Sequence, residues 1–140
     1  MSIDAALAEA YARALYVIET GDTRLTRRVG VVDAEADAVL REHGCRIGWW
    51  IVTPCNPRSL ALSGADNAER LNRCAVELRA LRWTTLPSHN SAEDGDWREP
   101  GFCIFDVDAE AVSALARRYG QSAIVGARLG TAPALRWLED

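Results

Sequence analysis

Apolar residues recur along this chain with two spacings, one typical of helices and one typical of strands. Spacings of three and four predict helices over residues 3–13, 33–43, 63–81, 109–119 and 132–138. Alternating or unbroken apolar runs predict strands over residues 15–18, 23–29, 47–52, 83–86, 102–107 and 122–125. Three of the helices are preceded by side chains that cap free backbone amides, namely Asp33, Ser63 and Asp108.

The polarity of each strand's two faces predicts where it lies in a sheet. Residues 47–52 and 102–107 are apolar on both faces, so both strands should be central and covered on both sides. Residues 15–30 hold a Gly-Asp turn between two short strands and predict a hairpin, whose polar second strand belongs at an edge. Residues 102–126 predict a βαβ unit with parallel strands and a right-handed crossover. The polar stretch 87–96 predicts a surface loop.

These elements together predict an α/β fold, with an α+β arrangement as the alternative. We expect one globular domain over residues 1–140, because this length suits a single hydrophobic core. The expected sheet is mixed and has five to six strands, with an N-terminal helix, an edge hairpin and the C-terminal βαβ unit.

Composition and charge argue against several classes of function. No apolar run approaches the roughly 20 residues that cross a membrane, and the N-terminus lacks a signal-peptide pattern. A cytoplasmic protein without a membrane partner is therefore expected. The net charge of −4 argues against general nucleic-acid binding, because phosphate contacts dominate that affinity. The four cysteines have no zinc-type spacing, and we predict neither a bound metal nor a cofactor.

The stretch 53–59 joins a buried strand to a helix through the rigid sequence Thr-Pro-Cys-Asn-Pro-Arg-Ser. Ligands of open α/β sheets bind beyond the carboxyl ends of strands, and a helix N-terminus favours an anion. We therefore predict binding of a small phosphate- or carboxylate-bearing molecule, such as a nucleotide, at this turn. The predicted binding residues carry hydroxyl, amide or guanidinium groups: Thr53, Asn56, Arg58, Ser59, Asn67, Arg70 and Gln121. Glu99 and His89 are acid/base candidates if the 87–96 loop folds over this strand end.

Other interpretations of the same residues stay open. The turn could be purely structural, with Gln121 bonded to loop backbone and Arg58 or Arg70 paired with Glu99. A non-enzymatic protein-interaction or homodimerisation module is the alternative function, and whether the chain is an enzyme is left open. A cysteine mechanism at Cys55 is disfavoured, because the sequence places no histidine beside it.

Several of these residues resemble a known bacterial family. The shared motifs are Tyr11 and Tyr16, Thr53 to Ser59 around Asn56-Pro57, Asn67 with Arg70, Trp97-x-Glu99, and Tyr119-Gly-Gln121-Ser-Ala-Ile. Over residues 11–137 the chain resembles the family named domain of unknown function 3293. Pro54 and Cys55 depart from the family pattern, which counts against a shared thiol mechanism. The family carries no established activity, so the resemblance implies only the extent of the fold and the location of the site.

Overall fold

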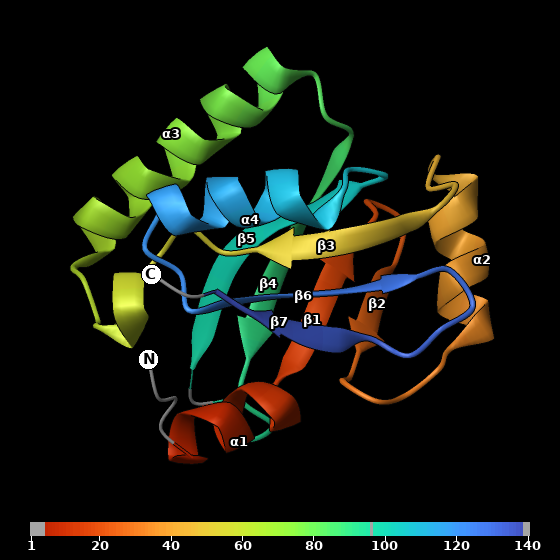
Figure 1. The fold of residues 1–140 in the computed structure, drawn as a ribbon, viewed down its shortest axis with the longest axis horizontal. Coiled ribbons are helices and arrows are strands. Elements are labelled where there is room, and N and C mark those ends of the chain that lie inside the picture. Colours follow the sequence, from red (N-terminus) through yellow and green to blue (C-terminus); the bar gives the residue numbers. More distant parts are fainter. Residues whose placement is uncertain (1–4, 96, 139–140) are drawn as a thin grey trace.

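The computed structural model describes residues 5–95 and 97–138 of the chain. The helices are α1 (Ala5–Arg13), α2 (Ala34–Glu42), α3 (Gly64–Leu81) and α4 (Ala109–Arg118), and the 3₁₀ turn η1 (Pro57–Ser59) precedes α3. The strands are β1 (Leu15–Glu19), β2 (Arg24–Arg27), β3 (Gly48–Val52), β4 (Thr85–Ser91), β5 (Arg98–Phe105), β6 (Ala123–Arg128) and β7 (Ala134–Trp137). Figure 1 shows α3 and α4 lying together over the sheet, with α2 and α1 set at separate sides of it.

The strands of the described residues form one seven-stranded sheet that curls into a half-barrel. Its order is β2-β1-β4-β5-β3-β6-β7, and every neighbouring pair is antiparallel. The α+β alternative is therefore confirmed, whereas the predicted mixed sheet of five to six strands is wrong. Both strands predicted to be central, β3 and β5, lie in the interior of the sheet and pair with each other.

The predicted C-terminal βαβ unit is wrong in its pairing, because β3 lies between β5 and β6. Since β3 is antiparallel to both, β5 and β6 run in the same direction without touching. In the same way β5 separates β3 from β4. The chain therefore forms two split βαβ units, in each of which a third strand lies between the two parallel ones. The connectivity is that of the ferredoxin-like βαββαβ motif, over β3-α3-β4-β5-α4-β6. Each helix crosses over one strand, which local sequence patterns do not encode.

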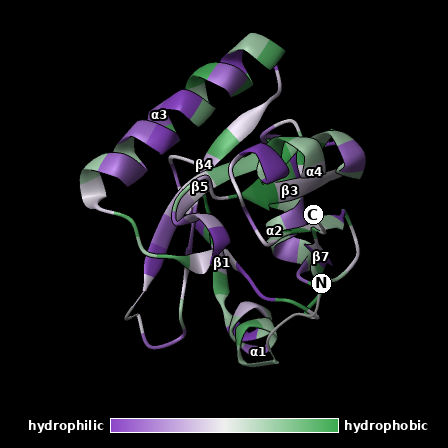
Figure 2. Ribbon diagram, turned by 60° about the vertical axis from the view of Figure 1, so that its left-hand side comes forward, coloured by the Kyte–Doolittle hydropathy of each residue, from purple (hydrophilic) through white to green (hydrophobic). Residues whose placement is uncertain are grey.

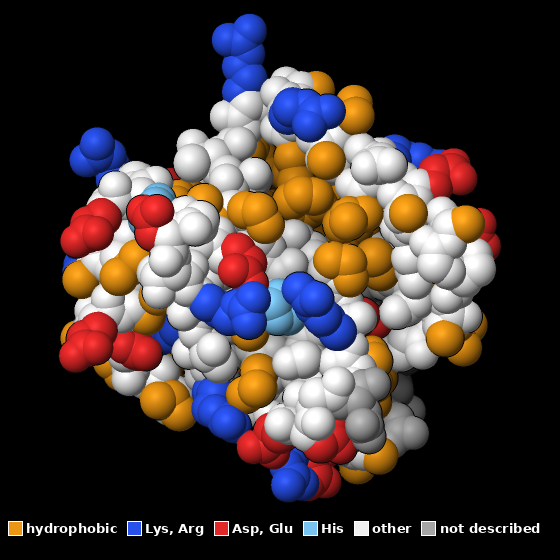
Figure 3. Space-filling view, turned by 180° about the vertical axis from the view of Figure 1, so that it is seen from behind, with side chains coloured by type: hydrophobic (Ala, Val, Ile, Leu, Met, Phe, Trp, Pro, Cys, Tyr) orange, Lys and Arg blue, Asp and Glu red, His pale blue; other side chains and the backbone are white. Residues whose placement is uncertain are grey.

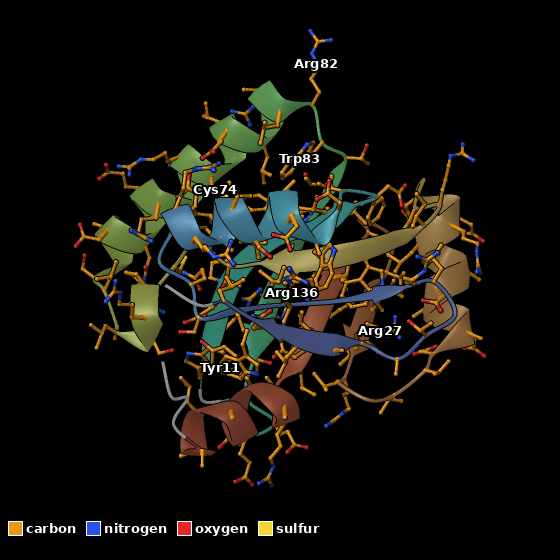
Figure 4. All side chains as sticks on the ribbon, viewed as in Figure 1. Tyr11, Arg27, Cys74, Arg82, Trp83 and Arg136 are labelled. Atoms are coloured by element: carbon orange, nitrogen blue, oxygen red, sulfur yellow. The ribbon has the colours of Figure 1, made fainter. Side chains whose placement is uncertain are left out.

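Side chains alternate between two cores on the two faces of the sheet. Trp49 and Ile51 of β3 enter a core on the face that carries α2, whereas Val52 enters a core with α3 and α4. On α3 the buried residues are Cys74 and Leu78, and in Figure 4 Cys74 lies on the side of α3 that faces α4. Figure 2 shows many hydrophilic residues along α3, in contrast to the largely hydrophobic β3. Both faces of β3 are thus covered, as its sequence predicts.

The predicted helix caps are confirmed. Asp33 accepts a hydrogen bond from the Ala36 amide, Ser63 from the Asp66 amide and Asp108 from the Ala111 amide. These local signals therefore place the starts of α2, α3 and α4 to within a residue. The first two residues of the predicted helix 3–13 lie outside the described part of the chain.

Two other predicted elements are wrong. Much of the predicted loop 87–96 is strand β4, which pairs with β1 on one side and β5 on the other. The predicted helix over residues 132–138 is instead the strand β7, which pairs with β6. In both segments tertiary pairing overrides a weak local preference, because a sheet offers backbone partners that polar or short segments accept. No helix in the described ranges is long and apolar enough to cross a membrane.

Candidate functional site

The segment after β3 folds into a tight turn built on unusual backbone conformations. Asn56, Arg58 and Ser59 all have positive φ angles, of 49°, 54° and 62°. The amide of Arg58 donates to the carbonyl of Gly120 at 2.7 Å, which ties the turn to the end of α4. Gly120, with φ of +70°, lies so close that a Cβ there would come within 2.9 Å of Pro57. The turn is thus held against the connection between α4 and β6.

Asn56 is the centre of a hydrogen-bond network in this turn. Its Nδ2 donates to Glu99 Oε2 at 2.8 Å, and its Oδ1 accepts from Asn67 Nδ2 at 2.8 Å and from the Leu62 amide at 3.0 Å. Asn67 Oδ1 in turn accepts from the backbone amide of Asn56 at 3.0 Å. The two asparagines therefore lock the start of α3 to the turn, and they also orient Glu99.

The side chains of Arg58 and Arg70, the two arginines among the predicted binding residues, do not pair with Glu99. Arg70 donates through Nε to the Pro54 carbonyl at 2.6 Å and through a second nitrogen to the Tyr119 carbonyl, with its guanidinium 5.6 Å from the Tyr119 ring centre. Arg58 is exposed. Neither forms an ion pair with Glu99 among the described residues, so the predicted arginine partner of this carboxyl is not found.

Thr53 and Gln121 lie beside Glu99 at neighbouring strand ends. The Thr53 hydroxyl is 3.3 Å from Gln121 Oε1 and 3.5 Å from Glu99 Oε1. Gln121 donates through Nε2 to the backbone carbonyls of Cys55 and Tyr119 at 2.9 and 3.2 Å, which is the structural role that the sequence left open. Gly101 lets the end of β3 lie this close to β5, because a Cβ there would lie 2.3 Å from the Val52 carbonyl oxygen.

Glu99 is a buried carboxyl surrounded by neutral donors. Burial raises its pKa, and hydrogen bonds from Asn56, Thr53 and Trp97 partly offset that effect by favouring the ionised form. Only 7 % of the residue is exposed to solvent. Among the described residues no cationic side chain balances this charge, which distinguishes Glu99 from the buried pair of Arg27 and Asp37 on the same face of the sheet.

Two cavities meet at Glu99. The inner cavity holds about 20 Å³, enough for one water molecule. The lining residues with polar groups are Tyr11, Tyr16, Thr53, Asn90, Trp97, Glu99 and Gln121. The outer pocket holds about 440 Å³ and is lined by Leu7, Ala10, Tyr11, Asn56, Ser59, Ala61, Ala92, Trp97 and Glu99. This volume lies within the range of about 300–1,000 Å³ that is usual for small-molecule sites.

Helix α1 forms one wall of the outer pocket through Tyr11. The Tyr11 hydroxyl lies 3.0 Å from Ser59 Oγ, its ring stacks on Trp137 at 5.2 Å, and its carbonyl accepts a hydrogen bond from Tyr16 at 2.6 Å. Figure 4 shows Tyr11 reaching from α1 toward the sheet. Although α1 has no buried residue, these contacts tie it to the turn at Ser59 and to β7.

His89 does not join Glu99. In the β4–β5 register His89 lies opposite Pro100, whereas Asn90 lies opposite Glu99, so the histidine is on the other face of the sheet. There its Nδ1 is 3.2 Å from Arg98, and burial and the charge of Arg98 lower its pKa. The face drawn in Figure 3 carries a histidine between basic side chains, next to a gathering of hydrophobic ones.

Cys55 is buried beneath the same turn. Burial and the nearby Glu99 raise the pKa of its thiol, the opposite of what an activated thiolate needs. Within the described ranges, no three His, Cys, Asp or Glu side chains are arranged to hold a metal ion.

Asn90 is the site residue that the sequence did not indicate. It lines the inner cavity, and its Oδ1 is buried without a hydrogen-bond partner among the described residues. The interpretation of residues 87–96 as a loop hid the alternation that places Asn90 and Glu99 on one face. Tyr11, Tyr16 and Trp97 entered the sequence analysis only through the family motifs, and all three line the inner cavity.

The fold and the site define an antiparallel α+β domain with a buried carboxyl between two cavities. The model of a family described as protein of unknown function (DUF3293) matches residues 52–124, which is just over half of the chain, and the chain belongs to that family. The match begins at the last residue of β3 and ends in β6. Comparisons with curated proteins and with solved structures give no significant match.

Proposed function

We propose that this protein binds a small organic molecule in the outer pocket, with Glu99 as the polar group that recognises it. The observation that carries the proposal is the position of the Glu99 carboxyl, which is shared by both cavities and oriented by Asn56 and Thr53. A buried, oriented polar group in a largely apolar pocket is the usual arrangement of a small-molecule site. Trp97 and Tyr11 supply aromatic walls.

Glu99 is also the proposed acid/base group if the bound molecule reacts, since its raised pKa suits proton exchange near neutral pH better than that of an exposed glutamate. The predicted partner His89 takes no part in this proposal, because it lies on the opposite face of the sheet. The predictions of an anionic ligand and of a protein-interaction module stay predictions. The lining of the outer pocket supports a different ligand class, since neither Arg58 nor Arg70 lines it.

A fragment screen followed by NMR tests the proposal. We expect hits that move the indole N–H signal of Trp97 and raise the melting temperature, because a ligand that binds only the native state stabilises it. The variant Ala61→Phe fills the pocket from its wall and should abolish these hits. The control Ala80→Phe makes the same change at an exposed position on α3 and should retain them. Hits that persist in Ala61→Phe, or a screen without any hit, would contradict the proposal.

A further inference from the structure

We propose that the ligand is an organic cation, a primary amine with an apolar chain, whose ammonium group pairs with Glu99. This inference rests on the proposed small-molecule site and names the class of ligand that the site accepts. Four features of the pocket, as formed by the described residues, support it: an uncompensated buried charge, an unpartnered acceptor beside it, aromatic walls and a lining without arginine.

The first feature is charge balance. Asn56, Thr53 and Trp97 donate to Glu99, and all three are neutral. A carboxylate removed from water is costly unless a cation accompanies it, and the described residues supply none here. The contrast lies within the same molecule, because Asp37, which is also hidden from solvent, has the guanidinium of Arg27 at 3.3 Å. A ligand cation would give Glu99 the partner that Asp37 already has.

The second feature is the chemistry of the inner cavity. Asn90 Oδ1 is a buried acceptor without a partner in the described part of the chain, and it lines the same small space as Glu99. An ammonium group at the junction of the two cavities has three N–H donors and no acceptor. One donor can reach the Glu99 carboxylate, and another can reach Asn90 through the single water for which the inner cavity has room. A ligand carboxylate or phosphate would meet the acceptor oxygens of both residues.

The third feature is the lining of the outer pocket. Tyr11 and Trp97 line it together with Glu99, and aromatic rings attract cations through their negative faces. The remaining side chains are mostly small and apolar: Leu7, Ala10, Ala61 and Ala92. They suit an alkyl chain that extends from the ammonium group.

The fourth feature argues against a zwitterion. An amino acid needs a cationic or amide partner for its carboxylate, but none of the described arginines lines either cavity. The amide nitrogen of Asn56 already donates to Glu99, and that of Gln121 donates to two backbone carbonyls. Arg70 is bonded to two backbone carbonyls, and Arg58 is exposed. The pocket therefore favours a simple amine over an amino acid.

A matched series of head groups tests the proposal. Pentylamine, pentanol and pentanoate differ only in whether they present an ammonium, a hydroxyl or a carboxylate. Titration of each, followed by the Trp97 indole signal, should give pentylamine about ten- to hundredfold tighter binding than the other two, as expected for a charge-assisted hydrogen bond. Equal or tighter binding of pentanoate would overturn the proposal. Failure of all three to move the Trp97 signal would instead refute the pocket itself as a ligand site.

Two variants locate the preference. Glu99→Gln should bring the affinity for pentylamine to within about twofold of that for pentanol. The control Glu69→Gln removes the same charge at an exposed site on α3 and should leave the preference for pentylamine intact. Tyr11→Leu leaves Glu99 and its three donors in place and removes one aromatic wall, so pentylamine should lose more affinity than pentanol in the Trp97 indole titration. The variant that removes the aromatic wall tests the cation site even if Glu99→Gln does not fold. A preference that survives both changes would place the amine elsewhere.

Discussion

Replacement of Asn56 by aspartate would place a second carboxyl against Glu99. The side chain keeps its shape, and the oxygen that accepts from Asn67 and Leu62 is retained. The Nδ2 group that donates to Glu99 Oε2 at 2.8 Å becomes an oxygen. Two ionised carboxylates at this distance cannot coexist in a buried site, so the pair must hold one proton in the folded state.

The cost of that proton gives the magnitude of the effect. Taking up a proton at pH 7 on a glutamate whose ordinary pKa is 4.5 costs about 3.4 kcal/mol, since each pH unit is worth about 1.36 kcal/mol. A protonated oxygen can then donate across the pair and restore the lost hydrogen bond. We therefore expect Asn56→Asp to lower the free energy of unfolding by about 3 kcal/mol at pH 7.

The pH dependence follows from the same proton. The pair has a raised pKa in the folded state, so its stability is fully present below the unfolded pKa and is lost as pH rises toward the folded pKa. The destabilisation should therefore shrink by up to about 1.4 kcal/mol per pH unit on acidification and nearly vanish at about pH 4. Urea denaturation of wild type and variant at several pH values measures it.

A matched control separates charge pairing from other effects. Asn72→Asp makes the same chemical change at an exposed position of α3 and should alter stability by less than about 0.5 kcal/mol at any of these pH values. If Asn56→Asp destabilises the protein equally at pH 4 and pH 7, the loss comes from packing or backbone conformation, and the reasoning about a shared proton is refuted.

Two further predictions concern the sheet. Gly126→Ala should lower the free energy of unfolding by about 1–3 kcal/mol, because a Cβ there would lie 2.3 Å from the Trp49 carbonyl oxygen and 2.5 Å from the Trp50 ring. Urea denaturation measures this loss, and an unchanged midpoint would contradict the prediction. Arg27→Met leaves the buried Asp37 without its cation and should lower the free energy of unfolding by about 3–5 kcal/mol. The double variant Arg27→Met/Asp37→Leu should recover much of this loss in urea denaturation. No recovery would show that the arginine acts mainly through packing.

The local elements of this protein could be predicted because they rest on interactions between residues close together in the chain. The caps at Asp33, Ser63 and Asp108 bond amides only three residues away, so sequence spacing alone places them. The two-faced apolar pattern of residues 47–52 likewise requires cover on both sides, wherever the strand lies in the sheet. The sequence also located the turn at Asn56 and singled out Glu99.

The order of the strands depends on partners distant in the chain, and only the tertiary structure decides it. Nothing in residues 132–138 indicates that the edge of β6 accepts a further strand, and nothing in residues 87–91 indicates that β1 and β5 will pair with them on both sides. The same pairing brings Asn90 beside Glu99 and turns His89 away. Side-chain direction in a strand has a period of two, so register alone determines which polar residues share a cavity. The sequence therefore determined the capped helices and the buried central strands and nominated Glu99, whereas the fold determined which side chains lie beside that carboxyl.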